Sequence, residues 1–257
     1  MIAKKKEEIA AMREACRRTA RHMRVLCEMV VPGATSGEID DMARELVEKD
    51  GDELGFYGYE SGNDGARFES ALCCSVNDVI VHSPAGQNNA RFEVGDLVTL
   101  DFGIRHKGFY SDMARTVIAG GAALNEDDER LVNGTYEAAE AGIAAARIGN
   151  TVGDIGYAVQ KVAEKYKLGY PTNLCGHGIG RQLHEEPRIP NFGVPGKGYK
   201  IVEGLIIAIE PMMTLGSGIL YVDKDGHSFR TKDGSRSAHV ENTIIVTKKG
   251  PEVFTKE

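Results

Sequence analysis

The sequence has 257 residues, of which 42% are hydrophobic and 27% charged, and its formal net charge is −7. These values indicate a globular protein, and we expect a single domain over residues 1–257. The negative charge argues against a nucleic-acid partner, and no apolar run approaches the roughly 18 residues of a spanning helix, so no membrane partner is expected either. The five cysteines are odd in number and include no C-x-x-C pair, which favours reduced thiols in a cytoplasmic protein.

The first third of the chain predicts two helices and then strands. Apolar residues at helical spacing predict a helix over residues 7–30, which Pro32 and Gly33 end. Thr35 and Glu38 form a capping-box pattern that begins a second helix reaching about Lys49. Residues 53–70 are rich in glycine and polar groups and are predicted to be a loop, whereas residues 71–82 indicate one or two strands.

The rest of the chain predicts a hairpin, two further helices and short strands. Residues 95–103 and 108–120 form two strands around a short turn, and helices follow over residues 126–147 and 152–167. The frame G-x-T-x-x-[ED]-I occurs at Gly33 and again at Gly149, each time between two helices. This repeat indicates two related α/β halves, although any helix–turn–helix junction needs a glycine and a cap.

Two aspartates in the predicted hairpin indicate a cation site. Asp101 and Asp112 are symmetric about a turn near His106-Lys107, so we expect them to face each other across the ladder, on one face. Like charges in that position need a neutralising partner, and a cation is the usual one. The alternative is an aspartate exposed to water at an edge or turn, which fits less well with the apolar neighbours Val98, Leu100 and Phe102.

The second half of the chain adds three candidate ligands. His177 and His184 lie in a glycine-rich segment, where a structural and a site role are both open. Glu210 follows an apolar run and Glu241 precedes one, so burial is expected for both carboxylates. Two aspartates, two glutamates and one histidine suit a pair of divalent cations with shared carboxylates.

Four segments resemble the methionine aminopeptidases, which share the pita-bread metallopeptidase family with the prolidases and aminopeptidase P. They are LDFGIRHKGFYSDMART, CGHGIGRQLHEEPRIPNFG, GLIIAIEPM and TKDGSRSAHVENTIIVT, at residues 100–116, 175–193, 204–212 and 231–247. The resemblance covers nearly the whole chain. It implies an α+β pita-bread fold, with two pseudo-symmetric α/β halves around a curved antiparallel sheet.

The resemblance also implies an active site. Two divalent ions (cobalt, manganese, iron or zinc) would be held by Asp101, Asp112, His177, Glu210 and Glu241. Glu210 matches the general base, and His82 and His184 match the histidines that contact the scissile nitrogen and the carbonyl. Candidates for the wall of the methionine pocket are Phe56, Tyr59, Cys73 and Leu183. The implied reaction removes the initiator methionine from nascent chains, by a cytoplasmic monomer that meets these N-terminal peptides at the ribosome.

The match is weakest around residues 60–70, where the chain is longer than bacterial methionine aminopeptidases, and at His227, where the family has tryptophan. Parts of residues 68–118 are similar to prolidases. In contrast, His239 and a chain that begins directly at the catalytic domain favour the methionine enzyme. Cleavage of Xaa-Pro bonds therefore stays the second hypothesis, and a binding or scaffold protein without turnover the third. His22, His106 and His227 are expected to be solvated.

Overall fold

The structure, a computed structural model, describes residues 1–60, 67–86, 89 and 91–256. Residues 61–66 of the longer segment lie outside the described residues. The helices are α1 (Lys6–Glu28), α2 (Ser36–Asp50), α3 (Glu126–Ala145) and α4 (Val152–Tyr166). The strands are β1 (Glu53–Leu54), β2 (Cys73–Val76), β3 (Val79–Val81), β4 (Leu97–His106), β5 (Phe109–Ile118), β6 (Cys175–Gly178), β7 (Glu185–Pro190), β8 (Ile206–Ile209), β9 (Met212–Thr214), β10 (Leu220–Val222), β11 (Phe229–Thr231), β12 (Ser237–His239), β13 (Glu241–Thr247) and β14 (Gly250–Val253).

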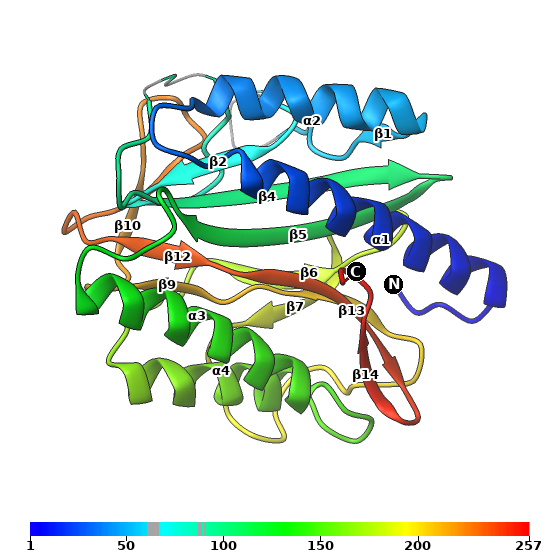
Figure 1. The fold of residues 1–257 in the computed structure, drawn as a ribbon. Coiled ribbons are helices and arrows are strands. Elements are labelled where there is room, and N and C mark those ends of the chain that lie inside the picture. The colour runs from blue at the N-terminus through cyan, green and yellow to red at the C-terminus, as the bar shows by residue number, and fades with distance from the viewer. Residues whose placement is uncertain (61–66, 87–88, 90, 257) are drawn as a thin grey trace.

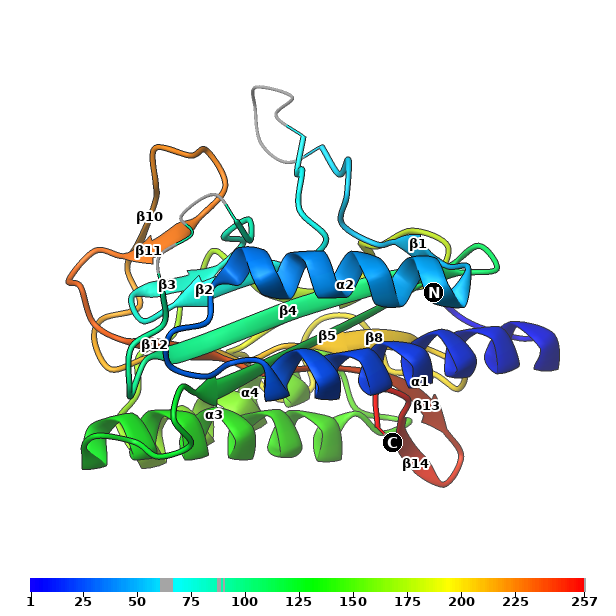
Figure 2. The same cartoon turned by 45° about the horizontal axis from the view of Figure 1, so that its top comes forward.

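A large antiparallel sheet forms the centre of the fold. Its strand order in the described chain is β1-β4-β5-β13-β8-β6-β7, with β2 paired to β4 and β14 paired to β13. Two small sheets, β10-β11-β3 and β12-β9, flank it. In Figure 1, α1 and α3 lie in front of the strands, with α2 along the top and α4 along the bottom, and Figure 2 shows the same elements turned by 45°. The predicted α+β class is confirmed.

The two helix pairs begin their second helices in the same way, as the sequence repeat predicts. Thr35 caps α2 with a capping box to Glu38, and Thr151 caps α4 with a capping box to Asp154. The glycine two residues before each cap has a positive φ, 90° at Gly33 and 98° at Gly149. Helix α1 packs on β4 and β5, whereas α4 packs on β7, so each pair covers its own part of the sheet.

The β4–β5 hairpin forms as predicted, but its register differs by two residues. His106 pairs with Phe109, so the turn consists of Lys107 and Gly108, and both have positive φ, 48° and 81°. A two-residue turn with this geometry is type I′, which matches the twist of the strands and favours glycine at its second position. The prediction that Asp101 and Asp112 are directly opposite is therefore wrong: Asp101 pairs with Ala114, and Asp112 pairs with Gly103. Because the shift is even, both aspartates stay on one face.

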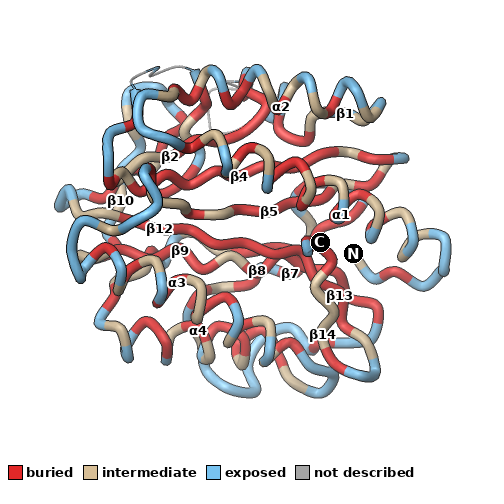
Figure 3. The backbone as a smooth tube through the Cα atoms, in the orientation of Figure 1, coloured by how far each residue is buried: buried red, intermediate tan, exposed pale blue. Residues whose placement is uncertain are grey.

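The strands are the most buried part of the chain. Figure 3 shows β4 and β13 almost wholly in the buried colour, with exposed segments along the helices and loops. Cys73 and Cys74 of β2 belong to two different core clusters, because neighbouring residues of a strand point to opposite faces. All five cysteines are free thiols.

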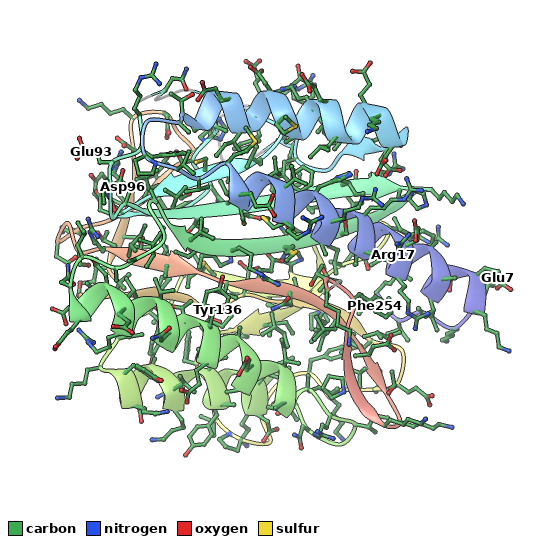
Figure 4. The ribbon with its side chains drawn as sticks, viewed as in Figure 1. Glu7, Arg17, Glu93, Asp96, Tyr136 and Phe254 are labelled. Atoms are coloured by element: carbon green, nitrogen blue, oxygen red, sulfur yellow. The ribbon has the colours of Figure 1, made fainter. Side chains whose placement is uncertain are left out.

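A side chain of α3 ties that helix to the sheet. Tyr136 donates a hydrogen bond from its hydroxyl to the Thr116 carbonyl of β5, at 3.2 Å (Figure 4). The helix thereby supports the strand that carries Asp112. In the described chain, no helix combines the length and the apolar character that a membrane span requires.

Candidate active site

Five strands bring the predicted ligands together from distant parts of the chain. Asp101 lies on β4, Asp112 on β5 and His177 on β6, while Glu210 directly follows β8 and Glu241 begins β13. Ala114 pairs with Asp101 on one side and with Glu241 on the other. A methyl side chain between two carboxylates leaves room on that face of the sheet for a ligand between them.

The distances join these side chains into one cluster. The Nε2 atom of His177 is 3.5 Å from Oε1 of Glu210 and 3.8 Å from Oδ2 of Asp112. One ligand atom each of Asp112, His177 and Glu241 lies within 4.8 Å of the others. Asp101 and Asp112 also lie close enough to affect each other's ionisation, because each carboxyl contributes to the pKa shift of the other.

Burial dominates the electrostatics of the cluster. It raises the pKa of Asp101 to about 7, and together with the neighbouring carboxylates it raises the pKa of Asp112, Glu210 and Glu241 well above their ordinary values. Burial lowers the pKa of His177 to about 3. Among the described residues, no lysine or arginine forms an ion pair with any of the four carboxylates. The cluster therefore lacks the positive charge that four closely spaced and largely buried carboxylates need.

These residues fit divalent metal ions. Oδ1 of Asp101 and Oε1 of Glu241 are buried without a hydrogen-bond partner in the described chain, which leaves both oxygens available to a cation. His177 has Nδ1 at 2.9 Å from the Gly178 carbonyl, so Nδ1 carries the proton and Nε2 presents its lone pair to the cluster. Carboxylate oxygens and imidazole nitrogens suit zinc and several other first-row ions.

The cluster opens into a cavity of about 550 Å³. All the site residues predicted from the sequence line this cavity, including the wall candidates Phe56, Tyr59, Cys73 and Leu183. Cys73 lies there because it pairs with Asp101 across β2 and β4. Other residues that line the cavity were not predicted from the sequence, and they include Phe68, Val81, Leu174 and Met212. The cavity thus has an apolar wall and a cluster of carboxylates at its bottom.

Two histidines face the cavity from other loops. His82 has a positive φ of 63°, a strained conformation for a non-glycine residue that places its ring against Phe229. The protein around the cavity desolvates this ring and lowers its pKa to about 4. His184 packs edge-on against His177, and its Nδ1 is 2.7 Å from the hydroxyl of Tyr59. Both imidazoles are neutral near pH 7 and can act as hydrogen-bond donors to a bound peptide.

Three histidines that the sequence predicts to be solvated are buried instead. His22 pairs with Asp50 at 3.0 Å, and His106 pairs with Asp52 at 2.6 Å. His227 packs edge-on against Phe68, with ring centroids 5.8 Å apart. The position that usually holds tryptophan thus still supports the aromatic wall of the cavity, through Phe68 from the longer segment.

Comparisons with known proteins agree with this geometry. Residues 10–248 match Metallopeptidase family M24. A methionine aminopeptidase from Clostridium perfringens is 37% identical over 255 residues, which are 99% of this chain and 98% of the relative. The crystal structure of methionine aminopeptidase from Thermotoga maritima matches with a TM-score of 0.93 at 36% identity, over 100% of both chains. The prolidase from Pyrococcus horikoshii OT3 matches at 0.75 and 23% identity, over 99% of this chain and 63% of the prolidase, which shows a shared fold alone. The expected pita-bread fold is confirmed.

Proposed function

This chain belongs to metallopeptidase family M24 and is a metal-dependent hydrolase, and we propose that it is a methionine aminopeptidase. The proposed reaction is hydrolysis of the first peptide bond of a chain that begins with methionine. The observation that carries the proposal is the placement of three buried carboxylates, the half-buried Glu210 and His177 in a cavity with an apolar wall. We further propose that residues 1–257 form one catalytic domain.

The apolar wall supports a methionine side chain as the group that binds there. Phe56 and Phe68 are buried and contact each other edge-on, with ring centroids 6.4 Å apart. Met212, Leu183 and Cys73 complete a surface of flexible and polarisable groups beside the cluster. A thioether chain fits such a wall without leaving a buried polar atom unpaired.

Asp101, Asp112, His177, Glu210 and Glu241 would hold the metal, and two divalent ions, of cobalt, manganese, iron or zinc, fit the five ligands. When bound, these ions supply Lewis-acid activation of water and of the scissile carbonyl. Glu210 would accept a proton from the attacking water and pass it to the leaving nitrogen. Its nearly buried position on the end of β8 holds the carboxylate against the cavity.

The two cavity histidines would orient the peptide bond. We propose that His184, held by Tyr59, donates a hydrogen bond to the substrate carbonyl as negative charge develops there. We propose that His82 contacts the scissile nitrogen. Its left-handed backbone conformation sets the direction in which the ring leaves the chain.

A peptide panel tests this function. The purified protein, supplied with each of the four metals in turn, is incubated with Met-Ala-Ser, Ala-Pro-Ser and Xaa-Pro dipeptides, and products are identified by mass spectrometry. We expect release of methionine alone, and a decrease in kcat of about 10²–10⁴-fold in Glu210→Gln. Glu203→Gln, an exposed glutamate, is the matched control and keeps full activity.

Each other outcome overturns the proposal in a different way. Cleavage of Xaa-Pro bonds without release of methionine would favour the second hypothesis. No metal bound and no peptide cleaved would favour a binding or scaffold protein.

The cellular setting is also a proposal. N-terminal peptides are the substrates, and we propose that the protein meets them at the ribosome, in the cytoplasm, as a monomer. Five free thiols support a reducing compartment. Sedimentation of the purified protein and its distribution between ribosomal and free fractions test these points.

A further inference from the structure

His239 lies beside the carboxylate cluster and has no part in the function described above. The residue ends β12 and is 1% exposed. In the described chain, neither of its ring nitrogens has a hydrogen-bond partner. Burying a polar ring without partners costs folding free energy, so a partner acquired in the working enzyme would explain its presence.

The backbone of His239 is held from two sides. β12 pairs with β9, and His239 is opposite Met212, two residues after Glu210. The Thr116 hydroxyl of β5 donates to the His239 carbonyl at 2.8 Å and accepts from the His239 N–H at 2.9 Å. The ring is therefore fixed relative to both Glu210 and the strand that carries Asp112.

The carboxylate of Glu210 lies between two imidazoles. Its Oε1 atom is 3.5 Å from Nε2 of His177, and its Oε2 atom is 3.6 Å from Nε2 of His239. Oε2 of Glu241 is slightly farther from Nε2 of His239, at 3.9 Å. One oxygen of Glu210 thus faces a proposed metal ligand, and the other faces His239.

The two imidazoles differ at their other nitrogen. Nδ1 of His177 donates to the Gly178 carbonyl, which is the arrangement that metal-ligating histidines usually have. Nδ1 of His239 has no such partner in the described chain. A proton on that atom would be a buried, unpaired donor, so the favourable tautomer carries the proton on Nε2, which faces the carboxylates. His239 is therefore suited to donate a hydrogen bond and His177 to bind a metal.

We propose that His239 is a positioning residue that donates its Nε2–H to Oε2 of Glu210 and thereby fixes the orientation of that carboxylate. The role rests on the proposed function, in which Glu210 is the general base. The distance of 3.6 Å exceeds a hydrogen bond by about 0.5 Å, a gap that a side-chain rotation closes. Glu210 and Glu241 are among the described residues that line the cavity, and His239 is not. His239 therefore acts through Glu210 and not directly on the substrate.

Two substitutions separate this role from mere packing. His239→Leu keeps a similar volume and removes the donor, whereas His239→Gln keeps an N–H donor. Calorimetric titration with Mn²⁺ gives the metal Kd and stoichiometry, and Met-Ala-Ser gives kcat and KM. We expect the leucine variant to lose about 10–100-fold in kcat and about 10-fold in metal affinity, with KM within about 3-fold. The glutamine variant should recover both to within about 5-fold.

His22→Leu is the matched control, because His22 is also a buried histidine but lies on α1 against Asp50. It should lower the Tm and leave the metal Kd and kcat unchanged. If His239→Leu does not fold, His239→Asn, whose shorter amide does not span the gap, replaces it with the same expectations.

Three results would overturn the proposal. The first is a leucine variant whose kcat and metal Kd stay within about 3-fold of the wild type. The second is a glutamine variant that recovers nothing. The third is loss of one bound ion in both variants, which would make His239 a direct ligand. If the wild type cleaves no methionine peptide, the proposed function fails, while the difference in metal affinity between the two variants still tests the position of His239.

Discussion

Removal of the metal should make the stability of this protein fall as the pH rises above about 7.5. In the folded, metal-free protein the pKa of Asp101 is about 7, and burial raises the pKa of Asp112, Glu210 and Glu241 well above the ordinary range. In the unfolded chain these carboxyls ionise near pH 4. The folded state therefore holds protons that the unfolded state has released, and the free energy of unfolding decreases with pH.

The histidines do not reverse this sign above about pH 7.5. Burial lowers the pKa of His177 and His239 to about 3, so these rings are neutral in the folded state. A histidine of the unfolded chain is half protonated near pH 6.5 and almost neutral about one pH unit higher, so the histidine contribution is nearly complete there. At lower pH the histidines and the carboxyls oppose each other, so the test belongs above pH 7.5.

The size of the effect follows from the number of retained protons. Each proton held by the folded state alone lowers the free energy of unfolding by about 1.4 kcal/mol per pH unit. We take one retained proton for the four clustered carboxyls, whose pKa values burial and mutual repulsion raise. From pH 7.5 to 8.5 the loss is then about 1.4 kcal/mol while that proton stays bound, a measurable share of a typical total stability.

Urea unfolding followed by circular dichroism measures this dependence at pH 7.5, 8.0 and 8.5, with chelator or with Mn²⁺. Metal binding requires ionised carboxylates, so Mn²⁺ should remove the slope. Glu241→Gln should reduce the slope in chelator, whereas Glu203→Gln, at an exposed position, should leave it unchanged. Equal stability of the chelated protein at pH 7.5 and 8.5, or a slope that persists with Mn²⁺, would refute the reasoning.

Three further substitutions test the cavity and its support. Phe68→Ala should lower kcat/KM for Met-Ala-Ser about 10-fold, mainly by raising KM, because the methionine side chain loses part of its apolar wall. An unchanged KM would show that Phe68 does not contact the methionine side chain. Thr243→Val should lower the free energy of unfolding by about 2 kcal/mol in urea, because the N–H and C=O of Asp112 both lose their hydroxyl partner. Thr243→Ser keeps the hydroxyl and should restore the free energy of unfolding. Equal stability of the valine and serine variants would contradict this explanation. Tyr59→Phe should lower kcat/KM about 3–10-fold, because the hydrogen bond between the Tyr59 hydroxyl and His184 is lost. Tyr57→Phe, at an exposed position, is the control and should leave kcat/KM unchanged.

The strands and helices could be predicted because their patterns are local. Thr35 and Glu38 contain the complete signal for a helix start, and the structure forms that capping box. The hairpin was also predicted, but its register differs, because the turn forms at Lys107 and Gly108, where both residues have a positive φ. Turn chemistry here outweighs the spacing of the charged residues.

The candidate site was predicted more completely than its surroundings. The structure brings Asp101 and Glu241 together across Ala114, as the resemblance implies, and their metal binding stays a prediction. Phe68 was missed because it lies in a segment without periodicity, and only tertiary packing brings it to the cavity. His106 was misjudged for a similar reason, since its partner Asp52 is 54 residues away in the chain.

The central strand of the large sheet follows both of its neighbours in the chain. β13 lies between β5 and β8, so neither of these strands can complete its hydrogen bonds until residues 241–247 have left the ribosome. Asp112 and Glu210 are both made earlier, on opposite sides of that gap. A growing chain therefore exposes two unfinished sheet edges until β13 inserts between them. The cluster that we propose as the metal site is complete only after that insertion, because Glu241 is itself the first residue of β13.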